Sequence, residues 1–499
     1  MSFFIIFAFS RASLPSRRTA AARQRPAHSE LAERLLAPPL RYDYGSQYNK
    51  FGTRLGLIAA TVGSAVGLGN IWRFPAETQA NGGAAFLLVY VACVLVLGIP
   101  VMLAEFSLGR GGQSDAAGVF RRFSPRSKWW ITGGLAIVAS YMIICFYMVV
   151  SGWTLEYLWQ SLTGGLYEST QAASDAALEK DFAARMQEYI CGTEGPLLCT
   201  YIMIVINIGV LLLGVRKGIE KVSNILMPLL FVLLLIFAAV ACTLPGAGDG
   251  VRFFLSPDFS KITPGVFVNA LGQAFFSLSL GMGILITYSA YYPHNVNLGK
   301  TAVTVSLLDL AVAMLMGFII FPSITSFGLT DAQLEGTTLV FVTLPEVFVH
   351  LGATQFWSIL FFLSLLVAAL TSTISISEVS VRFIQDRFHK GRTAATLIVM
   401  LPLFVLSGIC TLSFGALKDW TVCSLSIFDL LDTVATNYML PVVSILTCLY
   451  IGWFAPPTLL KDQLTNHGTV RARLYPTVRF ILRYIAPALI LIVLLSAIF

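Results

Sequence analysis

The sequence is divided into eleven long apolar runs, each about the length of a membrane-spanning helix. A membrane β-barrel would instead show short segments of alternating hydrophobicity. Because lipid offers no hydrogen-bond partner to a free backbone group, continuous apolar runs are expected to be helical. The sequence therefore predicts an all-α integral membrane protein with eleven spans, at roughly residues 52–76, 84–108, 129–160, 197–214, 222–244, 264–290, 301–328, 355–385, 394–415, 427–455 and 477–498.

The composition excludes most classes of water-soluble protein. Apolar residues make up 56% of the 499 residues and charged residues only 12%, about half the charged share of a soluble domain. So little charge cannot cover a surface in water, which excludes a cytosolic enzyme, a nucleic-acid binder and a disordered chain. The net charge of +7 is therefore expected to reflect basic cytoplasmic loops rather than a nucleic-acid partner.

The distribution of basic residues predicts how the chain crosses the membrane. With the N-terminus inside, 27 of the 33 lysines and arginines fall on the inner side. This bias favours a cytoplasmic N-terminus and an outer C-terminus. The expected location is the plasma membrane. The long outer loop 161–196 is acidic and contains Cys191, which could pair with Cys199 or remain free.

Residues 1–47 differ from the rest of the chain, because a short apolar stub is followed by an arginine-rich, acid-poor segment. Such a segment is typical of an organellar transit peptide, a disordered tail or a start codon assigned too far upstream. We expect a tail or a misassigned start, and a single transmembrane domain over residues 48–499.

Two spans contain residues that break helices. The first span includes Gly63, Gly67 and Gly69, and the sixth includes a serine- and glycine-rich stretch at 277–283. Gly63 and Gly67 could instead allow close helix packing. However, spans 1 and 6 begin two successive sets of five, and odd-numbered sets joined end to end must have opposite orientations. The pattern predicts inverted repeats (spans 1–5 and 6–10) around a central site, with unwound helices exposing carbonyls to cations and amides to anions.

Several motifs resemble the neurotransmitter:sodium symporter family. The matching segments are residues 54–56, 63–75, 81–86, 98–100, Glu105, 109–110, 273–279 and 370–372. The resemblance runs from about residue 48 to the end, and the absence of a twelfth span is similar to the prokaryotic-type amino-acid transporter branch. It implies sodium-coupled symport of an amino acid by alternating access.

The resemblance also implies two sodium sites. The first would use the Ala65 carbonyl and the side chains of Asn70, Ser277 and Asp309, where many relatives have asparagine at the last position. The second would use the carbonyls of Gly63, Val66 and Ala368 and the hydroxyls of Thr371 and Ser372. As alternatives, these two hydroxyls could bond to their own helix, and Asp309 could face water near a helix end, although an ionisable residue deep in a span favours a functional role.

An amino-acid site follows from the same resemblance. The amides of Leu68 and Gly69 and the Tyr147 hydroxyl would hold the carboxylate, unless Tyr147 is an interfacial aromatic residue. Oxygens of Ala65, Phe276, Ser277 and Ser279 would hold the ammonium group. The full substrate set is Ser64, Ala65, Gly67, Leu68, Gly69, Ile143, Tyr147, Phe276, Ser277, Ser279, Met282, Ser372 and Ile376.

Two positions in this set narrow the substrate. Monoamine members of the family carry an aspartate where this chain has Gly67, so the glycine favours a substrate that brings its own carboxylate. Met282 is flexible and tolerates different side chains. A neutral hydrophobic or aromatic amino acid is the expected substrate.

Charge pairs matching the family's gates lie on both sides of this site. Arg73 and Asp432 would form the outer gate, separated by water when open and paired when closed. Tyr291 and Asp386 match inner-gate positions. Tyr48 stands where the family usually has an N-terminal arginine, and Lys50 is a candidate substitute.

Chloride is not expected to be required. Tyr90, Gln273 and Ser277 match chloride-binding positions of animal relatives, but the fourth position is Ala313, which offers no donor. Asp309 would supply the negative charge instead.

Two rivals to symport come from other functional classes. A non-transporting amino-acid sensor could share the fold. A membrane enzyme is disfavoured because the five histidines are scattered without a metal motif, and neither a GxSxG nor a Walker sequence is present. The expected partners are the amino acid, sodium ions and membrane lipid, with no nucleic acid.

Overall fold

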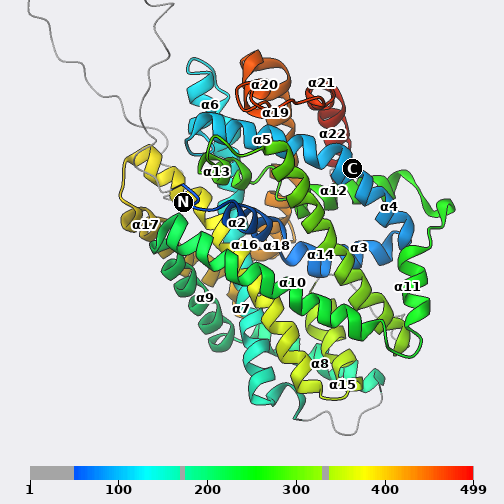
Figure 1. Cartoon of the computed structure of the whole chain (residues 1–499). Helices are drawn as coiled ribbons and strands as arrows, with labels where there is room; N and C mark the ends of the chain where they lie inside the picture. Colours follow the sequence, from blue (N-terminus) through cyan, green and yellow to red (C-terminus); the bar gives the residue numbers. More distant parts are fainter. Residues whose placement is uncertain (1–49, 169–174, 329–336, 498–499) are drawn as a thin grey trace, which may run out of the picture. The chain divides into compact units, whose positions relative to one another are not determined.

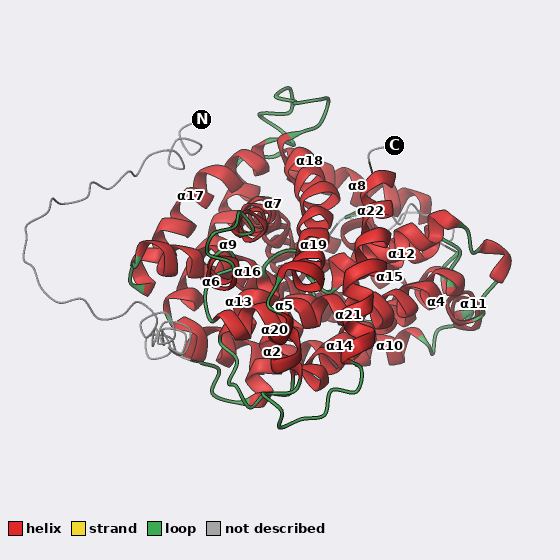
Figure 2. Cartoon of the chain, turned by 90° about the horizontal axis from the view of Figure 1, so that it is seen from above, coloured by secondary structure: helices red, strands yellow, loops and turns green. Residues whose placement is uncertain are grey.

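The described part of the chain is built almost entirely of helices. The computed structural model describes residues 50–168, 175–328 and 337–497, and Figure 2 shows helices joined by loops in these ranges. A bridge between Val422 and Leu425 is the one isolated pairing of extended backbone there. The predicted all-α class is therefore confirmed. The predicted N-terminal tail and Tyr48 lie outside the described residues.

Nine helices in the described ranges are long and apolar enough to cross a membrane, judged by length and composition. They are Ala84–Gly112 (α4, η4, α5), Trp130–Thr163 (α7), Glu194–Leu212 (α9), Val215–Ala241 (η6, α10), Leu298–Ser326 (α14), Thr354–Phe388 (α16), Arg392–Leu412 (α17), Ile427–Phe454 (α18, η9, α19, η10) and Tyr475–Ser496 (α21, η11, α22). Their ends differ from the predicted boundaries by at most about two turns.

Two further predicted spans are interrupted. Arg54–Ala65 (α2) and Gly69–Ala80 (η3 and α3) form a pair bent by 55°, which makes a tenth span if counted as one. The predicted span 264–290 consists of α12 (Pro264–Ser277) and α13 (Ile284–Ala290). Both α12 and α13 are shorter than the roughly 20 residues needed to cross a bilayer. The count of eleven therefore stays a prediction, because it treats α12 and α13 as one span.

Both interruptions lie at the predicted positions and have local causes. After α2, Val66 takes an extended conformation with ψ 102°. After α12, Gly281 and Gly283 have φ values of 79° and 73°, a region that glycine enters without the Cβ clash of other residues. The Gly281 amide, which has left the helical ladder, donates to the Glu105 carboxylate at 2.8 Å. A neighbouring span thus satisfies backbone that would otherwise be unpaired in an apolar interior.

Short helices that the sequence did not predict occupy the connections. They are α6 (Gly118–Phe123), η5 (Gly165–Tyr167), α8 (Asp175–Cys191), α11 (Ala247–Leu255), η7 (Phe259–Lys261), η8 (Leu339–Thr343), α15 (Leu344–His350) and α20 (Pro457–Leu464). The disulfide considered between Cys191 and Cys199 is not formed. Cys191 donates to the Phe414 carbonyl at 3.2 Å, and Cys199 donates to the Glu156 carboxylate at 3.3 Å.

The broken first span lies among other spans (Figure 1). Its first half, α2, packs against α10, α14 and α16, and most of its residues are buried. The sixth span is anchored in a similar way, because α13 packs along α5. A Cβ atom at Gly109 in α5 would overlap with the Ile286 carbonyl and the Ser289 hydroxyl in α13. This close approach fixes the segments that flank the second break.

We predict that Gly109→Ala lowers the midpoint of thermal unfolding of the purified protein. Overpacking a filled interior costs about 1–3 kcal/mol, and the atoms met here include backbone that cannot turn away. Gly209→Ala in α9 is the matched control, since no heavy atom lies within 4 Å of its added Cβ and alanine favours a helix. Equal unfolding midpoints for the two variants would contradict the close packing of α5 on α13.

Candidate functional site

A cavity lies where the two helix breaks meet. Its walls come from the first span, α7, the sixth span and α16, and the lining residues are Ser64, Ala65, Gly67, Gly69, Ile143, Tyr147, Phe276, Ser277, Ser279, Met282, Ser372 and Ile376. Every one of them belongs to the predicted substrate set. The remaining member, Leu68, is bonded to the wall through Tyr147.

The polar groups of the cavity are backbone groups released by the breaks and hydroxyls that reach them. The Leu68 amide donates to the Tyr147 hydroxyl at 3.0 Å, and the Ser279 hydroxyl donates to the Ser64 carbonyl at 2.7 Å. The Leu68 amide lies just before η3 (Gly69–Arg73), where the helix dipole favours an anion. The Ser64 carbonyl lies near the end of α2, where the dipole favours a cation. Tyr147 therefore lies in the cavity wall, not in an interfacial belt.

Gly67 leaves little room to spare in this wall. A Cβ atom there would lie 2.7 Å from the Ser372 hydroxyl and 2.9 Å from the Tyr147 hydroxyl. Apolar side chains, namely Ile143, Met282 and Ile376, cover other parts of the cavity. The cavity thus combines paired donors and acceptors with a neutral apolar lining.

A buried carboxylate cluster adjoins the cavity. Asn70 donates to Asp309 Oδ1 at 2.8 Å and to the Ser277 hydroxyl at 3.0 Å, and Ser277 donates to Asp309 Oδ2 at 2.7 Å. Asp309 is fully buried, so it does not face water at a helix end. None of the ion pairs among the described residues involves Asp309. A buried carboxylate held only by neutral donors is suited to a bound cation, and Ala65, the fourth predicted ligand, lines the adjoining cavity.

A second cluster contains neutral oxygens only. The Ser372 hydroxyl lies 3.4 Å from the carbonyl oxygens of both Gly63 and Val66. The Thr371 hydroxyl donates to the Ala368 carbonyl at 3.1 Å. The five predicted ligands of the second sodium site are therefore brought together between α2 and α16. Thr371 also makes the bond to its own helix that the alternative interpretation predicts, whereas Ser372 turns toward α2.

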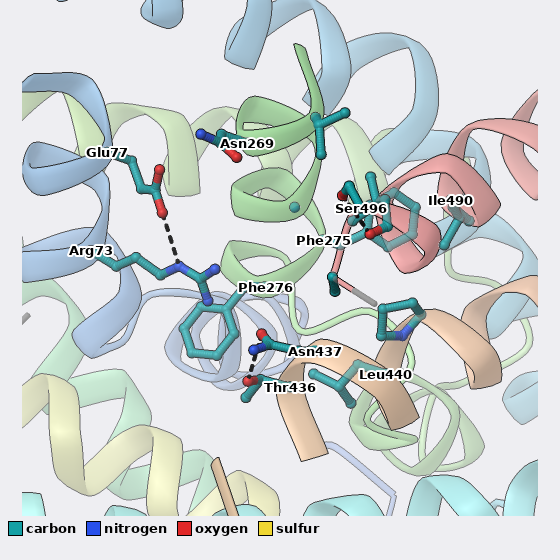
Figure 3. A pocket seen from close by; sticks show the side chains of 15 residues that line it. Arg73, Glu77, Asn269, Phe275, Phe276, Thr436, Asn437, Leu440, Ile490 and Ser496 are labelled. Atoms are coloured by element: carbon teal, nitrogen blue, oxygen red, sulfur yellow. Dashed lines mark hydrogen bonds and ion pairs between the residues drawn. The ribbon is translucent and has the colours of Figure 1, made fainter. Parts of the chain in front are cut away.

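On the predicted outer side lies a larger cavity, whose lining side chains are drawn in Figure 3. Phe276 lines both cavities, and the Arg73 guanidinium lies 4.9 Å from the centre of its ring. Arg73 pairs with Glu77 at 3.8 Å, four residues along the same helical segment, and not with Asp432 as expected for a closed gate. The Asp432 carboxylate accepts from Thr436 instead. The expected outer pair is thus not made in this structure.

The predicted inner gate residues meet through an arginine that sequence reasoning missed. Arg382 bonds to Asp386 at 3.0 Å, and its guanidinium lies 4.8 Å from the centre of the Tyr291 ring. Arg382 precedes Asp386 by one helical turn, an i, i+4 spacing that is visible in the sequence. None of the ion pairs among the described residues involves Lys50.

Two more residues and a loop acid complete this inner network. Tyr291 donates to Glu378 at 2.6 Å, and Arg392 makes two bonds to the same carboxylate at 2.7 and 2.6 Å. Outside the spans, burial and then the nearby Asp386 carboxylate raise the pKa of Asp115 to about 6. This end of the bundle therefore contains a dense charge network, which sequence spacing alone did not reveal.

Comparison with known proteins identifies the family. The model of the sodium:neurotransmitter symporter family matches residues 48–180 and 191–499. The chain belongs to this family. It is similar to the sodium-dependent transporter YhdH of Bacillus subtilis, with 35% identity over 90% of this chain and 97% of the relative, and to an uncharacterized sodium-dependent transporter of Haemophilus influenzae, with 35% identity over 91% and 99%.

A solved structure of the family shares the fold. The crystal structure of MhsT in complex with L-phenylalanine matches with a TM-score of 0.81 and 40% identity, over 90% of this chain and 99% of that one. The Drosophila melanogaster serotonin transporter is more distant, with 28% identity over 73% of this chain and 64% of the relative. The chain is therefore a sodium-dependent, multi-pass membrane transporter of this family.

We predict that replacing Thr371 and Ser372 together by alanine abolishes sodium-dependent substrate binding. The double change removes two of the five oxygens of the neutral cluster. Thr373→Ala is the matched control, because its hydroxyl bonds to the Leu370 carbonyl of its own helix. The measurement is binding at increasing sodium concentration, and an unchanged sodium dependence in the double variant would refute the site.

Proposed function

We propose that this transporter couples sodium to the uptake of a neutral hydrophobic or aromatic α-amino acid. The cavity between the two helix breaks is the observation that carries this proposal. Its Leu68 amide and Tyr147 hydroxyl suit a carboxylate, and its Ser64 carbonyl and Ser279 hydroxyl suit an ammonium group. Its apolar lining suits an uncharged side chain. The phenylalanine in the MhsT complex supports the same substrate class.

An α-amino acid fits this cavity better than a monoamine does. A monoamine needs a negative group from the protein, but the cavity wall at Gly67 has no side chain and little room for one. The buried Asp309 carboxylate already accepts hydrogen bonds from Asn70 and Ser277 beside the cavity. A substrate with both charged groups would match the donors and acceptors without demanding a further protein charge.

The two oxygen clusters are the proposed sodium sites. The cluster around Asp309 offers one negative charge, and the cluster around Ser372 offers neutral oxygens that would bind a cation without trapping it. Both clusters draw on the break in the first span, through Asn70 in one and Val66 in the other. Sodium at both would hold the broken helix against α14 and α16 and so favour a formed substrate cavity.

Transport by alternating access would use the two ends differently. On the outer side, Phe276 separates the two cavities, with Arg73 lying over its ring. On the inner side, the network of Tyr291, Glu378 and Arg382 closes the bundle. We place the N-terminus in the cytoplasm and the C-terminus outside the plasma membrane, with α12 and α13 counted as one of eleven spans in a domain covering residues 48–499.

A binding screen of the twenty amino acids, with and without sodium, tests this function. We expect sodium-dependent binding of phenylalanine and other large apolar amino acids. Tyr147→Phe should weaken it by about 1.5–3 kcal/mol, the range for a hydrogen bond to a charged group. Tyr141→Phe in the same helix is the matched control, because its hydroxyl bonds to the Val399 carbonyl. Equal affinity in wild type and Tyr147→Phe would show that the carboxylate binds elsewhere.

We further expect that transport needs no chloride. Asp309 supplies a fixed negative charge beside Ser277, and Ala313 contributes no donor to an anion site. A second anion beside the carboxylate would be repelled. Replacing chloride by gluconate should leave wild-type uptake unchanged, whereas Asp309→Asn should lose most uptake and regain part of it with chloride. A wild type that stops in gluconate would contradict the role given to Asp309.

A further inference from the structure

The beginning of α2 is held by a buried carboxylate from another span. Glu220 is the last residue of η6 (Val215–Glu220), and it is only 4% exposed. One of its oxygens accepts from the Gly52 amide at 2.8 Å. The other accepts from the Thr53 amide at 3.0 Å and from the Thr53 hydroxyl at 2.7 Å. All three hydrogen bonds therefore connect the fifth span to the start of the first.

This contact is favourable because the first amides of a helix lack partners within the helix. Thr53 is the N-cap of α2, and its hydroxyl accepts from the Gly56 amide at 3.0 Å while donating to Glu220. A carboxylate at this end also faces the positive end of the helix dipole. A Cβ atom at Gly56 would overlap with the Glu220 side chain. The close approach thus requires glycine at this position.

α2 is a short helix that connects the Glu220 contact at its start to the site at its end. The helix has 12 residues, and residues 66 and 67 beyond it are not helical, so that the pair of helices bends there by 55°. Its far end carries the Gly63 and Val66 carbonyls of the neutral cluster and the Ser64 wall of the cavity. A displacement of α2 as a whole would therefore move sodium ligands and the cavity wall together.

A second set of contacts holds α2, and the residues just before it, against the end of α13. The Phe51 ring packs edge-on against Tyr288, Tyr291 and Tyr292, at centroid distances of 5.9 to 6.3 Å. The Thr61 hydroxyl lies 2.6 Å from the Tyr292 hydroxyl. These contacts form a seam between α2 and the end of α13. The start of the first span is therefore held both by Glu220 and by this seam.

We propose that Glu220 is a positioning residue of the transport cycle, a latch that holds α2 in the inner-closed position. The inference rests on the proposed alternating-access function. When the latch releases, α2 swings away from α13 and opens the cavity toward the inner side. The same movement separates Gly63 and Val66 from Ser372 and dismantles the neutral cluster. An intact latch should therefore raise the affinity for sodium, and bound sodium should in turn stabilise the latched position of α2.

The test is the labelling rate of a cysteine placed in the seam. Thr61→Cys is introduced where Cys191, Cys242 and Cys423, the three native cysteines that are not buried, are replaced by serine. Glu220→Gln keeps the size of the side chain but removes the charge and places an amide group against the backbone donors. We expect about tenfold faster labelling without sodium and about tenfold more sodium for half-protection, within the range of measured couplings.

Matched variants separate a latch from a loss of structure. Glu156→Gln is the control, because this carboxylate also accepts hydrogen bonds, from Gln160 and Cys199, away from the seam. Gly56→Ala keeps the charge but displaces Glu220, so it should reproduce the Glu220→Gln result. Gly56→Ala combined with Glu220→Ala should be no worse than Glu220→Ala alone, since the overlap is gone.

The outcomes distinguish this proposal from the function on which it rests. Unchanged labelling and unchanged sodium protection in Glu220→Gln would overturn the latch. If sodium does not change the labelling rate of Thr61→Cys with Glu220 intact, the proposed coupling is overturned. The difference in labelling rate between the proteins with and without Glu220→Gln would still test the latch. If Glu220→Gln does not fold, Thr53→Val removes one of the three hydrogen bonds and should shift both readouts in the same direction by less.

Discussion

Two helices break inside an apolar interior, and their released backbone groups must find partners there. This requirement determines the positions of the side chains around the breaks. The Gly281 amide takes the Glu105 carboxylate, the Leu68 amide takes the Tyr147 hydroxyl, and the Ser64 carbonyl takes the Ser279 hydroxyl. The last two pairs lie at the cavity, where charged groups of a substrate can replace the protein partners. Groups that the fold must satisfy are therefore also groups that can bind a ligand.

Buried charge imposes a second requirement. Asp309 lies in the interior with hydrogen bonds from Asn70 and Ser277 but no protein cation among the described ion pairs. Such a carboxylate is costly without a positive partner, and a mobile cation can provide one. The neutral cluster at Ser372 has the opposite character, so a cation can leave it more easily. The contrast favours a cycle in which release begins at the neutral cluster.

The sequence allowed the helical class, the approximate spans and both breaks to be predicted, because apolar length and glycine placement are local properties. The cavity was predicted through family resemblance, and all of its lining residues were named. Contacts that depend on side-chain direction were not predictable. Arg73 turns to Glu77 instead of Asp432, and Asp386 pairs with Arg382 of its own helix.

Long-range contacts were equally hidden from sequence reasoning. Glu220 meets Thr53 from 167 residues away, and Arg392 reaches Glu378 across the turn between two spans. No periodicity or composition marks such pairs, because each depends on how whole helices pack. Among the helices of the connections, α8 was missed because its 17 residues contain no apolar run, and the others because they have at most nine residues.

Gradient-driven uptake into vesicles tests the account most directly. The purified chain is reconstituted into liposomes, and labelled phenylalanine is supplied with sodium either higher outside or equal on both sides. The account predicts transient accumulation above the external concentration under the gradient and simple equilibration, at most, without it. Sodium-dependent binding of phenylalanine with no accumulation under the gradient would contradict coupled transport and indicate a sensor with this fold.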